Sequence, residues 1–250
     1  MKSHIEKRNK VVLITGSARR LGKAVALQLH SEGMDVIIHC NNSSGDAEKL
    51  VKKMNSDREN SAFTFSFNLR DFANYENITE KLGKKWSDID VLINNASTFY
   101  PTLIEESTVE QWDDLHDVNL KAPYFLSKIF QSRLKNNSGC VINIVDIYSD
   151  NPLENFPIYS IAKAGLKMLT KSLSIELGPE VRVNGVSPGS IMWPEVKEYE
   201  GKHQEIIEST QLKRQGDVKD IANTCSFLIN KADYITGQII DVDGGRNLSR

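Results

Sequence analysis

The sequence lacks the features that mark several specialised classes of protein. Its 250 residues contain 3 cysteines, which are far apart and show no CxxC or Cys/His ligand spacing. A disulfide framework and a zinc site are therefore not supported, no metal site is predicted, and unpaired thiols are typical of a reducing compartment. No apolar run approaches the ~18 residues of a membrane-spanning helix. We expect a cytoplasmic protein with no membrane partner.

An excess of charge of either sign is also missing. The chain has 31 Lys+Arg against 33 Asp+Glu, a formal net charge of −2. Proteins that bind nucleic acids or anionic membranes normally carry a basic excess, so neither is an expected partner. Hydrophobic residues make up 40% of the chain, which is sufficient for an ordinary globular core. The basic segment 1–10 is interpreted as an N-terminal tail.

Short apolar runs alternate with helical patterns along almost the whole chain. The runs have the length and β-branched content of buried strands and cover 11–14, 36–38, 63–67, 91–93, 141–145, 181–186 and 239–242. Apolar residues at helical spacing cover 21–33, 47–54, 75–82, 109–130, 159–177 and 221–228, and a kink near Pro123 could interrupt the fourth of these. With no linker or repeat, this alternation predicts a single domain over residues 1–250. It is an α/β, Rossmann-like, doubly wound parallel sheet of about seven strands with helices on both faces.

Two segments depart from this alternation. Residues 146–157 and 188–216 are rich in Pro, Asn, Asp and Gly. Long loops in compact domains tend to carry function, so we interpret 188–216 as a substrate loop.

A glycine-containing turn follows the first expected strand. The sequence Thr15-Gly16-Ser17-Ala18-Arg19-Arg20-Leu21-Gly22 leads from that strand into a helical pattern. Gly16 can form the tight turn, Gly22 allows close packing of helix on sheet, and the helix N-terminus offers free N–H groups to a pyrophosphate. Ordinary strand-to-helix turns share this spacing, but its place after the first strand favours a dinucleotide site.

The segment after the second expected strand bears on the choice of cofactor. An NAD site usually has an acidic residue there, which accepts a hydrogen bond from the ribose 2′-OH. Here the segment is His39-Cys40-Asn41-Asn42-Ser43, without an acid, while Arg19 and Arg20 lie in the glycine turn. Cations and neutral donors suit a 2′-phosphate. The sequence therefore predicts NADPH/NADP+ as the cofactor.

Tyr159 and Lys163 are four residues apart in the helical pattern after the fifth expected strand, so they share one helix face. The ammonium would lower the tyrosine pKa from about 10 and could hold a ribose hydroxyl. Such a tyrosine can donate a proton to a reacting heteroatom as hydride arrives. Surface Tyr/Lys pairs are common, but the position of this one favours catalysis.

Together these motifs resemble the short-chain dehydrogenase/reductase family over nearly the whole chain. The matching elements are the glycine turn, Asn94-Asn95-Ala96, Asn119, the Tyr159/Lys163 pair and Pro188-Gly189. The resemblance implies that Tyr159 and Lys163 are catalytic and that Asn119 helps to hold a proton-relay water. It also implies a homotetramer.

One position departs from the usual family pattern. Where the family has a serine at the end of the fifth strand, this chain has Asp146. A carboxyl group suits an imine-type substrate whose ring nitrogen must gain a proton, whereas Asp146 as a simple loop cap would leave a reductase of ordinary ketones. With segments 94–101, 39–43 and 188–194, this aspartate makes the chain look like the pteridine reductase branch of the family.

That resemblance implies a set of site residues. Phe99 would stack the pterin against the nicotinamide, Ser97 and Arg20 would contact it, and Asp146, Tyr159 and Trp193 would complete the substrate site. The implied cofactor contacts are Gly16, Arg19, Arg20, Leu21, Gly22, His39, Asn41, Asn42, Ser43, Asn68, Leu69, Asn95, Ala96, Tyr159, Lys163, Pro188, Gly189 and Ser190.

The expected function is NADPH-dependent reduction of dihydropterins to tetrahydropterins, with oxidised pterins and dihydrofolate as further candidate substrates. Tyr159 or Asp146 would supply the proton. Two alternatives stay open at this point. One is a carbonyl or 3-oxoacyl reductase of the same fold, and the other is a non-catalytic regulator that binds NADP.

Overall fold

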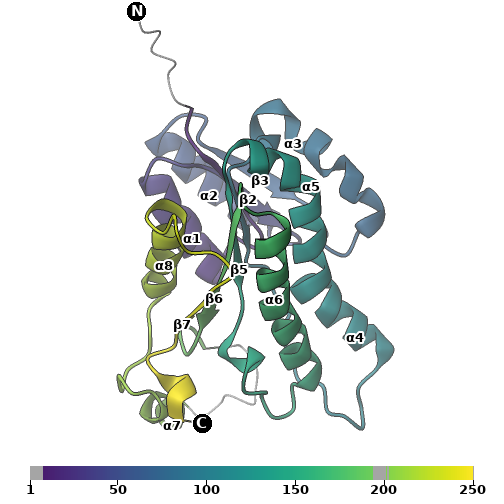
Figure 1. Ribbon diagram of the computed structural model, residues 1–250, viewed down its shortest axis with the longest axis vertical. Coiled ribbons are helices and arrows are strands. Elements are labelled where there is room, and N and C mark those ends of the chain that lie inside the picture. Colours follow the sequence, from purple (N-terminus) through teal and green to yellow (C-terminus); the bar gives the residue numbers. More distant parts are fainter. Residues whose placement is uncertain (1–7, 194–200, 202, 250) are drawn as a thin grey trace, which may run out of the picture.

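The computed structural model describes residues 8–193, 201 and 203–249 (Figure 1). Most of the expected basic tail, residues 1–7, lies outside the described residues, as do residues 194–200 and 202 of the expected substrate loop. No helix in the described part of the chain is long and apolar enough to cross a membrane.

Seven parallel strands form one sheet in the order β3-β2-β1-β4-β5-β6-β7. Their bounds are β1 Val11–Ile14, β2 Asp35–Cys40, β3 Ala62–Ser66, β4 Val91–Asn94, β5 Cys140–Ile144, β6 Arg182–Pro188 and β7 Ile239–Val242. The predicted fold class is confirmed, and each strand lies within two residues of its expected bounds.

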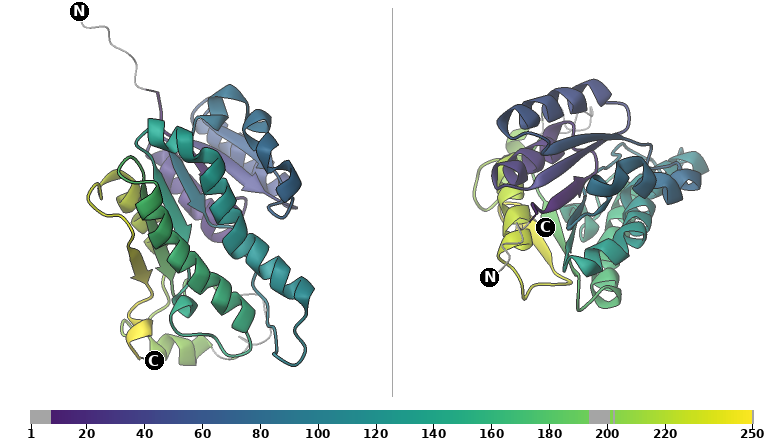
Figure 2. Two further views of the ribbon diagram at one scale, coloured as in Figure 1. Left: turned by 45° about the vertical axis from the view of Figure 1, so that its right-hand side comes forward. Right: turned by 90° about the horizontal axis from the view of Figure 1, so that it is seen from above.

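Helices cover both faces of the sheet because successive strand side chains point to opposite sides (Figures 1 and 2). Val12 and Ile14 pack with one group of helices, whereas Val11 and Leu13 pack with the other. The first group is α1 Arg20–Ser31, α2 Ser44–Asp57 and α8 Val218–Asn230; the second is α3 Ile78–Ser87, α5 Ala122–Asn136 and α6 Pro157–Glu176.

The sheet reverses its winding direction between β1 and β4. The chain adds β2 and β3 on one side of β1 and then returns to place β4 on the other. In open α/β sheets, this reversal leaves a crevice at the carboxyl ends of the strands, where ligands bind. The loops after β1, β4 and β5 all begin at this edge.

The helical stretch expected over 109–130 is divided in three. α4 (Val109–His116) is followed by a π-helical turn at Asp117–Lys121 and then by α5. Pro123 has no N–H to donate to the carbonyl of Asn119 four residues earlier, so a regular α-helix cannot continue through this point. The interruption precedes Pro123, and it places Asn119 in the widened turn.

Two further expectations are corrected. His39 and Cys40, expected to follow the second strand, lie within β2, so the loop itself begins at Asn41. The expected loop 188–216 includes a short helix, α7 (His203–Ser209).

Candidate active site

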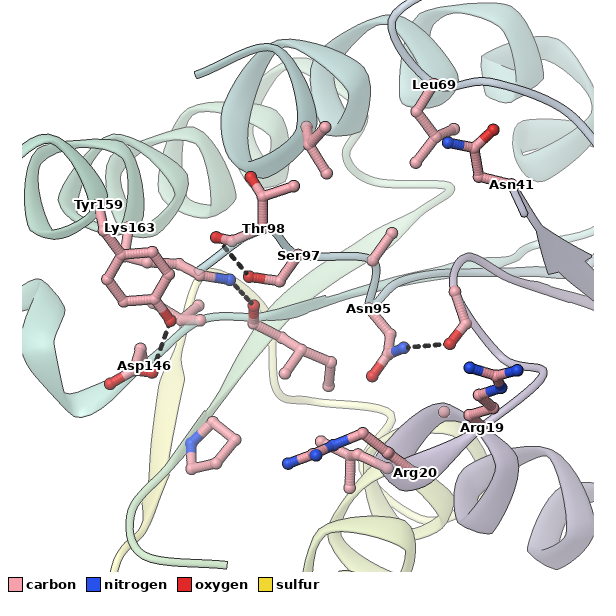
Figure 3. A pocket seen from close by; sticks show the side chains of 18 of the residues that line it. Arg19, Arg20, Asn41, Leu69, Asn95, Ser97, Thr98, Asp146, Tyr159 and Lys163 are labelled. Carbon is pink, nitrogen blue, oxygen red and sulfur yellow. Dashed lines mark hydrogen bonds between the residues drawn. The ribbon is translucent and has the colours of Figure 1, made fainter. Parts of the chain in front are cut away.

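Two adjoining cavities at the carboxyl edge of the sheet contain the expected site residues. The larger, of ≈ 500 Å³, runs from the glycine turn to the end of β5. The smaller, of ≈ 210 Å³, adjoins it and shares four lining residues with it, Asp146, Tyr159, Gly189 and Met192. Figure 3 shows Arg19 and Asn41 at one end of the larger cavity and Tyr159 and Asp146 at the other.

The glycine turn is shaped by close packing. Gly16 has φ +63°, a left-handed conformation that glycine adopts without a Cβ clash. A Cβ added to Gly22 would lie 2.6 Å from Asn95 Nδ2 and 2.7 Å from the Gly16 carbonyl oxygen. The missing side chains let the turn pack closely against Asn95 and Ala96, and they bring its backbone to the edge of the cavity, where a dinucleotide pyrophosphate could be held.

Hydrogen bonds fix this turn to the end of β4. Thr15 Oγ1 accepts from the backbone N–H groups of Asn95 and Ala96, both at 2.9 Å. The Asn95 amide donates back to the carbonyls of Thr15 (2.8 Å) and Gly16 (3.2 Å). Asn95 and Ala96 both line the cavity, but the Asn95 side chain is occupied in holding the turn.

His39 lies against the turn rather than beyond the strand. Its Nδ1 accepts from Gly16 N at 3.0 Å and its Nε2 donates to Phe67 O at 2.9 Å, so the ring is neutral and both nitrogens are used. Burial lowers the pKa of His39 to about 4. The ring borders the cavity, as expected for a residue near the cofactor, and its hydrogen bond to Gly16 also positions the glycine turn.

Only some of the residues expected near a 2′-phosphate line the larger cavity. Arg19, Arg20 and Asn41 line the larger cavity, whereas Asn42 and Ser43 are absent from its lining among the described residues. Arg19 forms an ion pair with Asp46 in the first turn of α2. Arg20 has φ +50° and donates to the Trp193 carbonyl at 2.9 Å, which links the glycine turn to the segment after β6.

Asp146 and Tyr159 form the polar centre of the cavity end opposite the glycine turn, which we call the chemical end. The Tyr159 hydroxyl donates to Asp146 Oδ2 at 2.7 Å, while Asp146 Oδ1 accepts from Tyr148 N at 2.9 Å (Figure 3). Asp146 thus caps the 3₁₀ turn at Ile147–Ser149 and also contacts the tyrosine. Burial raises the pKa of Asp146, despite the hydrogen bonds and the charges of Lys163 and Arg246, which oppose the shift. This carboxyl group therefore holds a proton more readily than an exposed aspartate.

Lys163 lies one helical turn after Tyr159 and is buried. Its ammonium donates to the Ile144 carbonyl at 3.0 Å and lies 5.7 Å from the centre of the Tyr159 ring. Burial lowers the pKa of Lys163 to about 8, against the opposing charge of Asp146. The expected pair shares one helix face and lines the larger cavity.

Asn119 is buried next to the larger cavity and binds residues of its wall through hydrogen bonds. Its amide donates to the carbonyls of Leu115 (2.9 Å) and Thr98 (3.0 Å), and its Oδ1 accepts from the Ser97 hydroxyl at 2.6 Å. Among the described residues, Asn119 is not part of the cavity lining, whereas Ser97 is. Because the Ser97 proton is used on Asn119, this hydroxyl faces a ligand as an acceptor.

Aromatic rings form the walls of the smaller cavity. Phe99 stacks on Phe156 with centroids 4.6 Å apart and meets the Tyr159 ring edge-on at 4.8 Å. Trp193 stacks on His203 of α7 at 4.0 Å. Phe99 and Trp193 thus line the same cavity as the Asp146–Tyr159 pair, and one face of Phe99 is covered by Phe156.

The remaining expected contacts also gather at this edge. Leu21, Asn68, Leu69, Pro188 and Gly189 line the larger cavity, and Ser190 lines the smaller one. The sequence-based expectations missed Tyr148 and Arg246, which line the smaller cavity. The Asp243-Gly244-Gly245 turn after the last strand was the signal that could have pointed to Arg246.

The chain is similar to known proteins over nearly its whole length. A family model described as enoyl-(acyl carrier protein) reductase matches residues 16–247. Over 280 aligned residues the chain is 33% identical to pteridine reductase 1 of Leishmania tarentolae, covering 96% of this chain and 97% of that protein. It is also 33% identical to the 3-oxoacyl-[acyl-carrier-protein] reductase FabG of Staphylococcus epidermidis over 241 residues, covering 95% and 98%. The FabG of Staphylococcus aureus is 34% identical over 244 residues, covering 96% and 98%.

Proposed function

The chain belongs to the short-chain dehydrogenase/reductase family of NAD(P)-dependent reductases, and we propose that it is an NADPH-dependent pteridine reductase that converts dihydropterins to tetrahydropterins. The observation that carries this proposal is the hydrogen bond between the Tyr159 hydroxyl and the buried Asp146 carboxyl. Reduction of a ring C=N adds a hydride to carbon and a proton to the adjacent nitrogen. Bound NADPH supplies the hydride, so the protein must supply the proton.

The residues at the chemical end can perform this proton transfer. The Tyr159 hydroxyl donates its proton to the ring nitrogen, and the Lys163 ammonium stabilises the negative charge left on the phenol oxygen. For this step the Asp146 carboxyl starts protonated, which its raised pKa favours; its proton passes to the phenol oxygen across their 2.7 Å contact, and solvent then reprotonates the carboxylate. A neutral serine in place of Asp146 could align a carbonyl oxygen but would hold no acidic proton.

The hydrogen-bonding polarity of Ser97 also supports a pterin. Its hydroxyl donates to Asn119 at 2.6 Å and so accepts from the ligand side. The aminopyrimidine ring of a pterin carries N–H donors, whereas a simple ketone or thioester carries only acceptors there. Phe99 beside Tyr159 fits a flat ring held between an aromatic wall and a nicotinamide.

The preference for NADPH rests on charge near the end of β2. Arg19 and Arg20 line the larger cavity, and a neighbouring groove carries Lys23, Lys49 and Lys53. Asp46 offsets only part of this charge through its ion pair with Arg19. A 2′-phosphate is therefore attracted to this end of the site.

A 3-oxoacyl reductase is the second candidate, because the FabG proteins are as similar to this chain as the pteridine reductase is. Asp146 also caps the turn after β5, a role that would not require catalysis. If this candidate is right, the protein reduces 3-oxoacyl thioesters, and replacement of Asp146 leaves that activity unchanged.

The two candidates are separated by following the oxidation of NADPH, and of NADH in parallel, with two sets of substrates. One set contains dihydrobiopterin, dihydromonapterin and dihydrofolate, and the other contains 3-oxoacyl thioesters and simple ketones. We expect turnover of pterins with NADPH and a large loss in Asp146→Ser. No turnover of any pterin would refute the proposal. Binding of NADPH without turnover of any substrate would support a regulator instead.

We also propose that the chain forms a homotetramer. Ile161, Met168 and Ile175 recur every seven residues on α6 and are 50%, 64% and 78% exposed. A second copy of the chain could bury this apolar stripe. Light scattering coupled to size-exclusion chromatography tests the assembly, and Met168→Glu should weaken it.

A further inference from the structure

Arg246 is a buried cation in the smaller cavity that the proposed mechanism does not use. It begins the 3₁₀ turn Arg246–Ser249 after β7 and is 7% exposed. It lines the cavity together with Asp146, Tyr159 and Phe99. Its charge therefore lies at the chemical end, on the side away from the glycine turn.

The guanidinium has few partners. Nη1 donates to Ser190 Oγ at 3.0 Å, and the group lies 5.8 Å from the centre of the Tyr148 ring. Nε is buried and has no hydrogen-bond partner. Among the described residues no carboxylate comes within ion-pair distance of Arg246, as the ion pairs of the chain involve other side chains.

The acid closest in sequence, Asp243, is occupied elsewhere. Its Oδ1 accepts from Gly245 N at 2.8 Å and its Oδ2 from Asn247 N at 2.7 Å. Gly244 and Gly245 have φ values of +65° and +77°, so the turn depends on residues that adopt this conformation freely. The turn is thus held by backbone contacts, and it presents Arg246 without neutralising it.

A guanidinium remains charged when it is buried, and an unpaired buried charge is costly. A buried guanidinium that lines a cavity and has no carboxylate partner among the described residues therefore indicates a ligand that supplies an anion. Arginine forms charge-assisted, often paired, hydrogen bonds with carboxylates and phosphates.

We propose that Arg246 binds an anionic substituent of the substrate, a carboxylate or a phosphate monoester, carried by the ring on the side remote from the glycine turn. This inference rests on the proposed pterin activity for the identity of the ring. Tyr148 and Trp193 line the same cavity and would enclose the part of the substrate that links its ring to the anionic group. Arg246 would then favour substrates with an acidic side chain over neutral ones.

The test compares two fluorescent pterins that differ in one group, neopterin and neopterin phosphate. Each is titrated onto the full chain saturated with NADP+, and binding is followed by the quenching of pterin fluorescence. We expect neopterin phosphate to bind about tenfold more tightly, as one charge-assisted pair allows. In Arg246→Gln this advantage should vanish while the affinity for neopterin stays within about twofold.

Two controls make the result specific. Arg214→Gln removes an arginine that is 60% exposed and pairs with Asp220, so it should leave the tenfold advantage intact. Arg246→Lys retains the charge without the planar fork and should retain part of the advantage. Unchanged neopterin affinity in Arg246→Gln shows that the variant is folded.

Each outcome bears on one of the two proposals. Binding of both pterins with equal affinity to the parental chain would overturn the role of Arg246 and leave the pteridine reductase in place. Binding of neither pterin would overturn the proposed function and the inference together. In a competition titration, inorganic phosphate should displace neopterin phosphate only at concentrations far above the Kd of neopterin phosphate. Displacement at concentrations close to that Kd would mean that the site takes free anions and that the assignment to a substrate is wrong.

Discussion

The two ends of the active-site cavity are stabilised in different ways. At the glycine turn, Thr15, Asn95 and the neutral ring of His39 satisfy one another and the backbone with hydrogen bonds. At the chemical end, Asp146 and Lys163 are buried ionisable groups with shifted pKa values. At the first end uncharged groups form the frame beside which Arg19 and Arg20 lie, whereas the second end holds buried groups whose pKa values are shifted. The hydrogen-bonded frame and the buried ionisable groups with shifted pKa values are therefore separated along one cavity.

The largest effect should come from the chemical end. Tyr159→Phe removes the hydroxyl that bonds Asp146, and loss of a general acid costs about 10³-fold in kcat. NADPH affinity should change little, because the glycine turn is untouched. Stopped-flow oxidation of NADPH and a separate titration of the cofactor measure the two quantities. A kcat within tenfold of the parental value would assign the proton transfer to Asp146 alone.

Acid should lower the free energy of unfolding through His39, which lies at the glycine-turn end of the cavity. His39 has a folded-state pKa of about 4, and an unfolded histidine titrates near pH 6.5. Between these values the unfolded chain binds the extra proton, so the free energy of unfolding falls by about 3 kcal/mol as pH drops through this window. Above pH 6.5 the contribution is complete.

This acid sensitivity is measured by denaturant unfolding at several pH values from 7 to 4. In His39→Gln the part due to His39 should be absent, although the variant is less stable at pH 7 because Gly16 loses an acceptor. His116→Gln, at the end of α4, is the matched control and should keep the parental dependence on pH. An identical dependence in both variants would show that His39 does not stay neutral.

Packing at the glycine turn should give a smaller effect. In Gly22→Ala the new Cβ would lie 2.6 Å from Asn95 Nδ2, and such overpacking costs about 1–3 kcal/mol. We expect weaker NADPH binding and a lower Tm. Gly45→Ala is the control, because nothing lies within 4 Å of its added Cβ in α2, and it should be neutral or stabilising. Equal effects of the two substitutions would contradict the close-packed turn.

The smallest effect concerns how the buried Asp146 carboxyl changes the stability of the folded protein with pH. Burial raises the pKa of Asp146, so above pH 3.8 the folded chain retains this proton more than the unfolded chain does. The free energy of unfolding therefore falls as pH rises through the folded-state pKa. Asp146→Asn removes this penalty, and its Tm relative to the parental chain should increase from pH 4 to pH 7. A constant Tm difference would mean that the carboxyl pKa is not raised.

Local patterns predicted a large part of this molecule. The strand around Val11–Ile14 follows from a short β-branched run, and the shared helix face of Tyr159 and Lys163 follows from their spacing of four. Predictions were weaker where contacts decide the outcome. The sequence placed His39 after the second strand, whereas it lies inside β2 with both ring nitrogens bonded, because a histidine near a strand end does not reveal whether its ring meets solvent or a neighbouring turn.

The sequence by itself determined the alternation of strands and helices, the glycine turn and the spacing of Tyr159 and Lys163, because these depend on neighbouring residues. The tertiary structure decided which of these groups are buried, and therefore which pKa values shift. It brought Arg246 beside Asp146 across 100 residues of chain, and it turned the Ser97 hydroxyl into an acceptor through Asn119. Burial and hydrogen-bond direction depend on contacts between distant segments, which no local pattern encodes.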